Sequence, residues 1–336
     1  MRAPMSWLAE LVDVPAGTTG EDVHAALVRV GLEEEALHGG DVTGPLVVGR
    51  VLSFEEEPQK NGKTIRWVQV DVGEEQPRGI VCGAANFHVD DLVVVSLPGA
   101  VLPGGFAIAA RKTYGHVSDG MIASERELGL GDDHDGILRL NAKGFEATPG
   151  DDALALLGLD DVAVEVNVTP DRGYVLSMRG MARELALSTG WSYRDPAAID
   201  AGEGSGFPVT IADDAPIRGV VGCGRFVARA VRGIDATRAT PRWMQQRLTL
   251  AGMRPISIAV DVTNYVMLEL GQPIHGYDLD LLQGGITVRR AAAGETLVTL
   301  DGVTRTLDVE DLLICDDMGP VGLAGVMGGD RTEMSE

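Results

Sequence analysis

Residues 261–278, DVTNYVMLELGQPIHGYD, combine a threonine, an asparagine and a histidine that could bind or activate a ligand. Asp261 can cap a helix, and Gly271 can end it. Thr263 and Asn264 then fall in the first turn of this predicted helix. Backbone N–H groups are free there, and the helix dipole favours anions. The sequence therefore predicts that these two side chains lie where an anionic group could bind.

His275 lies past the far end of the same predicted helix, in a chain with only six histidines. Nine helical residues span roughly 13 Å, and five extended residues cover about 17 Å. The chain could therefore fold back and bring His275 beside Thr263 and Asn264, although nothing in the local sequence compels it. The alternative is that His275 only bonds a backbone carbonyl after the helix.

Arginines concentrate in one stretch of an acidic chain. The net charge is −22 over 336 residues, which by itself argues against a polyphosphate partner. Residues 218–254 nevertheless hold a single acid, Asp235, and eight arginines, at positions 218, 225, 229, 232, 238, 242, 247 and 254. This stretch either forms a solubilising face or binds an anionic ligand, with the acidic remainder limiting non-specific RNA binding.

Several other chemistries are absent from the sequence. It has no GxxxxGK[ST] phosphate loop, no GxSxG and no cysteine in the setting of a nucleophile. GDDHDG (131–136) does not match an EF-hand, because Gly131 and Ala142 would occupy ligand positions 1 and 12. We interpret it as an Asp-rich turn and predict no metal site.

The bulk composition indicates a globular protein of about two or three domains. No apolar run approaches the roughly 18 residues that a membrane span needs. The N-terminus, MRAPMSWLAELVDVP, lacks the long apolar region of a signal peptide. Three cysteines, Cys82, Cys223 and Cys315, lie far apart in apolar settings. They are predicted to be buried free thiols in a reducing cytoplasm.

Hydrophobic periodicity predicts a mixed α and β chain. Apolar residues follow helical spacing over 5–14 and 20–32, up to a stop near Gly39-Gly40. From 46 to about 140 the period changes to two, which predicts about five short strands and a small closed barrel.

Four local signals mark elements in the rest of the chain. Ser177 can cap a helix that Gly190 ends. A second helix is predicted to open at Thr240 and Pro241 and to close at Gly252. A linker is predicted at 191–206. The run TLVTL-DG-VTRTL (296–307) predicts a hairpin with a type I′ turn at Asp301-Gly302.

Several segments together resemble one family, the β subunit of bacterial phenylalanyl-tRNA synthetase, over nearly the whole chain. IVCGAANFHVDDLVVVSLPGAVLPGG and SDGMIASERELGLGDDHDGIL resemble its tRNA-binding OB-fold domain. VTPDRGYVLSMRGMARELA resembles its TPNR-type segment and the following helix. MRPISIAVDVTNYVMLELGQPIHGYDLD, TLDGVTRTL and GLAGVMGG resemble its B3/B4 editing domain.

The resemblance implies an α+β multidomain fold. We expect a helical segment over 1–40 that packs with 151–200, an OB-fold barrel over 41–150, a helical segment and linker over 151–200, and a B3/B4 editing domain over 201–336. Because the chain stops at Glu336, just after GLAGVMGG, we expect this last domain to be incomplete. The family's acidic residue that reads the tyrosine hydroxyl would lie beyond Glu336, as would its later domains.

The resemblance also implies roles for single residues. Thr263, Asn264 and His275 match a site that hydrolyses tyrosine wrongly attached to tRNA, and Ala324 and Gly325 match residues that shape its pocket. Such a site is needed because an apolar pocket rejects one added hydroxyl by only roughly a hundredfold. The ester is already activated, so a positioned water and polar groups can suffice without a covalent nucleophile.

Four cations are candidates for RNA contact. Arg242 and Arg247 belong to the Arg-rich stretch, which we expect to guide the acceptor end of the tRNA. Lys63 and Arg66 lie in EPQKNGKTIRW, where the family often has HPNADKLRV.

As a whole, the resemblance implies a β subunit that supports attachment of Phe to tRNA(Phe) by the α subunit, in a cytoplasmic heterotetramer of two α and two β chains. The complete enzyme would use ATP and Mg²⁺, and no cofactor is expected in this chain. Two alternatives stay open. The chain could be a tRNA-binding module without catalytic activity, or a scaffold for subunit assembly.

Overall fold

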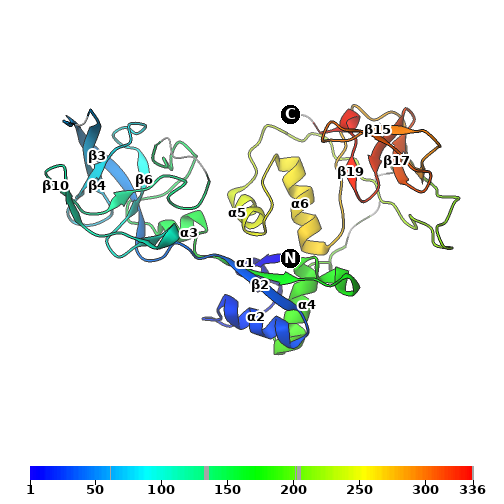
Figure 1. Ribbon diagram of the computed structural model, residues 1–336, viewed down its shortest axis with the longest axis horizontal. Coiled ribbons are helices and arrows are strands. Elements are labelled where there is room, and N and C mark those ends of the chain that lie inside the picture. Colours follow the sequence, from blue (N-terminus) through cyan, green and yellow to red (C-terminus); the bar gives the residue numbers. More distant parts are fainter. Residues whose placement is uncertain (61, 132–135, 201, 203–205, 335–336) are drawn as a thin grey trace. The chain divides into compact units, whose positions relative to one another are not determined.

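The computed structural model describes residues 1–60, 62–131, 136–200, 202 and 206–334. The chain divides into two compact units. Unit 1 holds Met1, Trp7–Glu34 and Val166–Glu336, and unit 2 holds Arg2–Ser6 and Glu35–Glu165. Figure 1 shows the helices and strands of both. Among these described residues, no helix is long and apolar enough to cross a membrane.

Unit 2 is built around a five-stranded sheet that curls into a nearly closed barrel. The strands lie in the order β11-β6-β3-β4-β5, and β11 also contacts β5 at the other edge. Along β4, Val68 and Val70 are buried while their neighbours Trp67 and Gln69 are only partly buried, as expected for a sheet with one face in the core. The predicted small barrel is therefore confirmed. Its strands are β3 (Leu46–Pro58), β4 (Thr64–Asp71), β5 (Arg78–Cys82), β6 (Leu92–Ser96) and β11 (Met121–Ile122).

Short elements extend this barrel. They are β7 (Val101–Leu102), the 3-10 turn η1 (Pro103–Gly105), β8 (Phe106–Ala107), β9 (Arg111–Thr113), β10 (His116–Ser118) and the helix α3 (Ala153–Leu157). Strands β9 and β10 form a hairpin, and β10 lies beside β5. Residues 132–135 of GDDHDG lie outside the described residues, as do residues 201 and 203–205 of the predicted linker.

A three-stranded sheet joins segments far apart in the sequence, in the order β1 (Arg2–Pro4), β12 (Val162–Asn167) and β2 (Glu33–Gly39). The sequence did not predict β2. Its first three residues are all glutamates, so no apolar alternation announces a strand. The strand exists because β12 supplies a hydrogen-bonding partner, and such a long-range pairing has no local signal.

The helices of unit 1 follow their capping signals closely. Thr19 caps α2 (Gly20–Arg29) in a reciprocal capping box with Asp22. Ser177 accepts a hydrogen bond from the Gly180 N–H at the start of α4 (Met178–Thr189), and Gly190 ends that helix in a left-handed conformation. The predicted caps of α4 are confirmed. The 3-10 segment η2 (Pro170–Val175) precedes it, and α1 (Met5–Leu11) begins the helical part.

Two predicted helix starts are wrong by a few residues. The helix α5 (Arg242–Leu250) has Pro241, not Thr240, as its N-cap. The helix α6 (Ile258–Leu270) begins before Asp261, which lies buried in its first turn. The Asp261 carboxylate accepts hydrogen bonds from the Thr240 hydroxyl (2.5 Å) and from the backbone N–H of residue 256 (2.8 Å). Asp261 therefore ties α6 to the segment before α5 and does not cap the helix.

The C-terminal part of unit 1 is a five-stranded mixed sheet with a hairpin beside it. The sheet runs in the order β13-β14-β17-β18-β19, with β13 parallel to β14 and the other pairs antiparallel. Its strands are β13 (Val209–Ala212), β14 (Ile286–Arg290), β17 (Leu312–Asp316), β18 (Gly319–Leu323) and β19 (Met327–Gly328), followed by the 3-10 turn η3 (Asp330–Thr332). An α+β fold is thus confirmed.

The predicted hairpin at 296–307 exists, but its turn type is wrong. Strands β15 (Thr296–Val298) and β16 (Thr304–Thr306) are paired, and Gly302 has a φ of 73°. Asp301 does not have the positive φ that a type I′ turn requires. The Asp301 carboxylate instead accepts hydrogen bonds from Thr299 and Arg305, and Thr299 and Val303 close a three-residue loop.

All three cysteines are free. Cys82 and Cys315 are buried as predicted, whereas Cys223 is only partly buried. Cys223 lies in a segment without regular secondary structure after β13, so no sheet neighbour covers it fully.

Candidate functional site

His275 belongs to the segment of unit 1 that follows α6. Its ring packs against the β18–β19 hairpin. A Cβ atom on Gly328 would lie 2.3 Å from Cε1 and Nε2 of the imidazole. No real side chain tolerates that distance, so the ring occupies the space that only a glycine leaves. His275 also meets Tyr277 edge to face, with ring centroids 4.7 Å apart. A histidine after a helix end is thereby fixed on a strand far along the chain.

Two glycines make this arrangement possible. Gly322 on β18 and Gly328 on β19 face each other in the hairpin. The Tyr277 hydroxyl would lie 3.4 Å from a Cβ on Gly322, just as His275 covers Gly328. We call the four residues Gly322, Gly328, His275 and Tyr277 the glycine cradle. In this cradle, the rings of His275 and Tyr277 lie against the backbone of two residues that have no side chain.

Backbone and packing contacts hold the histidine segment in place. The Asp278 N–H donates to the Thr332 carbonyl (3.1 Å), and the Met334 side chain packs where a Cβ on Gly276 would stand. On the neighbouring hairpin, the Leu300 N–H donates to the Gly328 carbonyl (3.1 Å). The cradle is therefore supported from both sides by elements of the same unit.

The electrostatic environment keeps the cradle uncharged. His275 is exposed at one edge, but the covered part of its ring loses water, and this burial lowers its pKa. Burial raises the pKa of Tyr277 to about 12. Near pH 7 the imidazole is therefore neutral and can accept a proton, while the phenol keeps its proton and can donate a hydrogen bond.

Ala324 and Gly325 form the turn of the same hairpin. The Ala324 N–H donates to the Leu312 carbonyl (2.9 Å), and Gly325 has a φ of 71°, which favours glycine. The structure thus brings His275 to the hairpin whose turn holds these two small residues. This juxtaposition matches the grouping that the resemblance implied.

Thr263 and Asn264 are not joined to His275. They lie in the second turn of α6, so their backbone N–H groups are not at the free end of the helix. The Thr263 hydroxyl donates to the Val260 carbonyl (2.8 Å) within the helix. Across the part of the chain that the structure describes, no hydrogen bond or ring contact links either residue to His275. The prediction that both lie in the first turn is wrong because α6 begins earlier.

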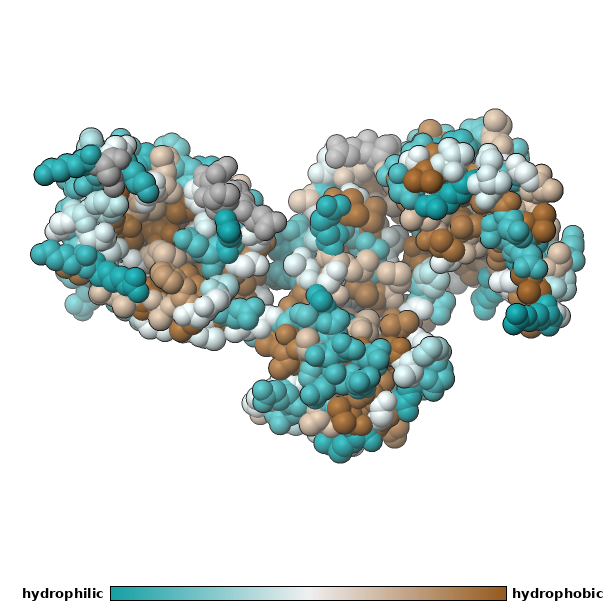
Figure 2. All heavy atoms as spheres, viewed as in Figure 1, coloured by the Kyte–Doolittle hydropathy of each residue, from teal (hydrophilic) through white to brown (hydrophobic). Residues whose placement is uncertain are grey.

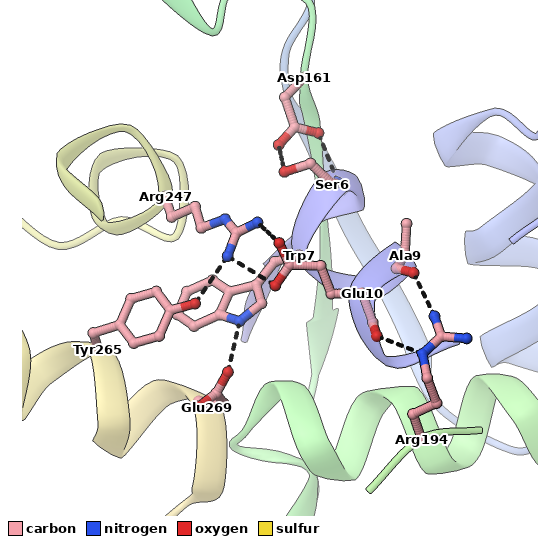
Figure 3. Close-up of polar contacts among 9 residues, drawn as sticks. All are labelled: Ser6, Trp7, Ala9, Glu10, Asp161, Arg194, Arg247, Tyr265 and Glu269. Carbon is pink, nitrogen blue, oxygen red and sulfur yellow. Dashed lines mark hydrogen bonds and ion pairs between the residues drawn. The ribbon is translucent and has the colours of Figure 1, made fainter. Parts of the chain in front are cut away.

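Arg247 lies at a joint between α1, α5 and α6, which Figure 3 shows in close-up. Its guanidinium bonds the Glu10 carboxylate and the Tyr265 hydroxyl (2.9 Å). It also lies 5.6 Å from the ring centroids of Trp7 and Trp243. Arg247 is therefore engaged inside the protein.

The same joint carries a stack of aromatic rings. Trp7 stacks on Tyr265 with centroids 4.2 Å apart, and its indole N–H donates to Glu269 (3.4 Å). Trp7 is fully buried, so this contact contributes both apolar burial and ring stacking.

The other RNA candidates lie in different surroundings. Arg66 lies over the rings of Phe54 and Phe87 and bonds Glu56 and the Phe87 carbonyl, so its side chain is only 13% exposed. Lys63 is exposed in the turn between β3 and β4, and Arg242 is partly buried as the first residue of α5.

Comparisons with known proteins connect these parts. A B3/4 domain model matches residues 222–336, inside unit 1, and a putative tRNA binding domain model matches residues 46–151, inside unit 2. The chain is 64% identical over 351 residues to the phenylalanine–tRNA ligase beta subunit of Leifsonia xyli, covering 99% of the chain and 41% of that protein. Its identity to the subunits of Streptomyces avermitilis and Bifidobacterium longum is 56% and 53%.

Over nearly its whole length the chain is therefore similar to phenylalanine–tRNA ligase beta subunits. It spans about two fifths of the length of these relatives: 41%, 40% and 41% of the three proteins. A solved N-terminal fragment of the phenylalanyl-tRNA synthetase beta-subunit from Pyrococcus horikoshii covers 53% of each chain at 13% identity and a TM-score of 0.27, and no conclusion rests on it.

Three members of the cradle, Tyr277, Gly322 and Gly328, were not predicted from the sequence. Tyr277 follows His275 at a distance of two residues, the spacing at which two rings of an extended segment point the same way. Gly322 and Gly328 belong to GLAGVMGG, where repeated glycines in a strand signal a close approach of other groups. These signals were visible in the sequence, but the sequence did not show which residues would pack against each other.

The described residues hold no cluster of metal-ligating side chains. Over the residues that the structure describes, no three His, Cys, Asp or Glu side chains lie together as a metal site would require. We therefore derive no metal-dependent step for this chain.

Proposed function

We propose that this chain is the tRNA-binding and proofreading part of a phenylalanine–tRNA ligase β subunit, and that it hydrolyses Tyr-tRNA(Phe). One observation carries the hydrolytic part. The neutral ring of His275 is packed on Gly328, in the hairpin whose turn is Ala324 and Gly325. The proposal is supported by this position, because Ala324 and Gly325 are small and would leave room for an amino acid near the candidate base His275.

The proposed reaction adds water across the ester that joins the amino acid to the terminal ribose of the tRNA. The acyl C–O bond breaks, the ribose regains its hydroxyl, and tyrosine leaves as the free amino acid. His275 accepts a proton from the attacking water, a role that the lowered pKa of its imidazole supports. General base catalysis of this kind contributes about 10²- to 10⁴-fold.

Tyr277 is the hydrogen-bond donor that we assign to the cradle. Its hydroxyl lies near the backbone of Gly322 and keeps its proton at neutral pH. Such a donor can orient the water or the substrate carbonyl. Thr263 and Asn264 stay in the proposal as substrate contacts from α6. Because no hydrogen bond joins them to His275 among the described residues, Thr263→Ala and Asn264→Ala test them separately from His275.

The proposed tRNA contacts divide into two kinds. Lys63 is assigned to RNA because it is exposed in a turn, and Arg242 because it belongs to the Arg-rich stretch. Arg66 and Arg247 are assigned to positioning, because both guanidinium groups are engaged within the protein. In the complete ligase, the α subunit would attach Phe to tRNA(Phe) with ATP and Mg²⁺ in a heterotetramer of two α and two β chains.

A second candidate function is tRNA binding or subunit assembly without hydrolysis. It is supported by the lack of any hydrogen bond from Thr263 or Asn264 to His275 among the residues that the structure describes.

The deciding experiment measures release of the amino acid from preformed Tyr-tRNA(Phe) by the 336-residue chain, with Phe-tRNA(Phe) as the substrate control. We expect selective release of tyrosine, and a fall of about 10²-fold or more in His275→Ala. His88→Ala is the matched control, because its side chain is 78% exposed on unit 2. Absence of release by the folded chain would favour the second candidate, whereas full activity of His275→Ala would overturn the role given to His275.

A further inference from the structure

The β9–β10 hairpin of unit 2 turns on a strained tyrosine. Its two central residues, Tyr114 and Gly115, have φ of 49° and 90°. Both values are positive, as a type I′ turn requires, and asparagine, aspartate or glycine is the usual first residue of that turn. A tyrosine there is held in a conformation that its side chain disfavours. The Tyr114 side chain is also 43% exposed, so core packing does not explain its presence.

Ring packing and a hydrogen bond hold this hairpin against the barrel. Trp67 lies flat across Gly79, where a Cβ would be only 2.2 Å from the indole ring. His116 stacks on Trp67, with centroids 4.3 Å apart and an interplanar angle of 15°. The His116 Nε2 lies 2.8 Å from a carboxylate oxygen of Glu57. The hairpin is therefore positioned before any ligand arrives.

Positive and aromatic side chains gather on the hairpin and beside it. Arg111 and Lys112 are exposed on β9, and the Arg111 guanidinium lies 5.7 Å from the ring centroid of Phe106, which is 49% exposed. Figure 2 shows hydrophilic side chains projecting from unit 2 at the edge where Figure 1 labels β10.

The neighbouring carboxylates do not neutralise these cations. Glu57 bonds His116, and Asp119 bonds Arg78 (2.7 Å). In a chain with a net charge of −22, a positively charged hairpin with exposed rings is a local exception.

We propose that Phe106, Arg111, Lys112 and Tyr114 form a stacking surface for unpaired nucleotides of RNA. Exposed rings accept the π faces of bases, and the two cations suit the phosphates between them. RNA is favoured over an acidic peptide because residues 46–151 match a putative tRNA binding domain. The inference rests on the tRNA-binding part of the proposed function and is independent of the hydrolysis.

Tyr114→Asn separates an RNA-binding role from a structural one. Asparagine tolerates positive φ, so this variant should unfold at a higher temperature than the wild-type chain. It should also bind a single-stranded RNA of about 12 nucleotides, and unacylated tRNA(Phe), roughly 5- to 100-fold more weakly, because one base loses its stacking partner. Tyr114→Phe should keep the affinity. A tyrosine with only a structural role would give lower stability and unchanged affinity in Tyr114→Asn, which would overturn the proposal.

The charge component is tested with the double variant Arg111→Ala/Lys112→Ala. The slope of log K against log salt should become shallower by about 1.4, since each phosphate contact on single-stranded RNA contributes about 0.7. The double variant Arg50→Ala/Arg126→Ala is the matched control, because it removes the same charge from exposed positions elsewhere on unit 2. Equal slope changes in both pairs would overturn the assignment while leaving tRNA binding by the chain intact. If the wild-type chain bound neither RNA, the surface and the tRNA-binding part of the proposed function would both fail, whereas hydrolysis would be judged by its own assay.

Discussion

Gly328→Ala should displace His275 without removing it. The added Cβ would lie 2.3 Å from Cε1 and Nε2 of the imidazole, whereas carbon atoms in contact prefer about 3.5–4.0 Å. The ring must therefore move by more than about 1 Å, and its exposed edge leaves the solvent side as the direction of movement. A misplacement of about 1 Å in a catalytic arrangement costs roughly 10²-fold in rate. Overpacking costs about 1–3 kcal/mol, and we expect the lower end of that range because the ring can swing outward.

The assay combines hydrolysis with stability. Release of tyrosine from Tyr-tRNA(Phe) should fall roughly 100-fold, and urea unfolding should report a loss of about 1 kcal/mol. The double variant Gly328→Ala/His275→Ala removes the ring that the new methyl group meets and leaves Leu300 Cδ1 as the nearest atom, at 3.3 Å, so the added methyl should cost clearly less in that background. Gly224→Ala is the matched control. A Cβ at that position meets nothing within 4 Å, and its φ is not left-handed.

Two results would refute the reasoning. If Gly328→Ala released tyrosine at the wild-type rate, the position of the His275 ring on Gly328 would not matter for hydrolysis. If the methyl group cost as much stability in the His275→Ala background as in the wild type, the imidazole would not be the group that it meets.

Two further predictions concern stability. Arg247→Ala should lower the free energy of unfolding by about 2 kcal/mol, because the contacts with Glu10, Tyr265 and the neighbouring indole rings are lost, while the released Glu10 carboxylate stays more than half exposed. Arg247→Lys should recover only part of this stability in urea unfolding, because an ammonium group cannot form the two-pronged contact of a guanidinium. An unchanged urea midpoint for Arg247→Ala would contradict the joint described here. His275 has a folded pKa below its ordinary value, so the native state binds fewer protons than the unfolded state and its contribution is lost as pH falls below about 6.5. Unfolding midpoints at pH 7.5 and 5.0 should therefore differ less in His275→Gln than in the wild type, and equal differences would show that His275 is not desolvated.

Local sequence signals were sufficient for the elements whose formation depends on neighbouring residues. Ser177 and Gly190 predicted the ends of α4, because caps satisfy backbone groups within one turn. The period-two pattern predicted the barrel strands, since alternate residues along a strand face the same core. The type I′ prediction at Asp301-Gly302 was wrong because the Asp301 carboxylate bonds neighbours that hold the loop open by one more residue.

The candidate site was predictable only in part. The segment HGYD and the glycines of GLAGVMGG were visible as unusual, and the resemblance named His275, Ala324 and Gly325 together. Only the tertiary structure placed the His275 ring on Gly328 and the Tyr277 hydroxyl beside Gly322. It also started α6 before Asp261, which puts Thr263 and Asn264 in the second turn of that helix.

By itself, the sequence determined the local elements, the acidic net charge and the residue types available for chemistry. The tertiary structure decided which of those residues meet. It engaged Arg247 with Glu10 and Tyr265, formed β2 from a run of glutamates beside β12, and packed His275 on a bare strand. The physical reason is one of range. Caps and periodicity act within a few residues, whereas each of these contacts joins segments far apart in the chain and exists only because packing of the whole unit brings them together.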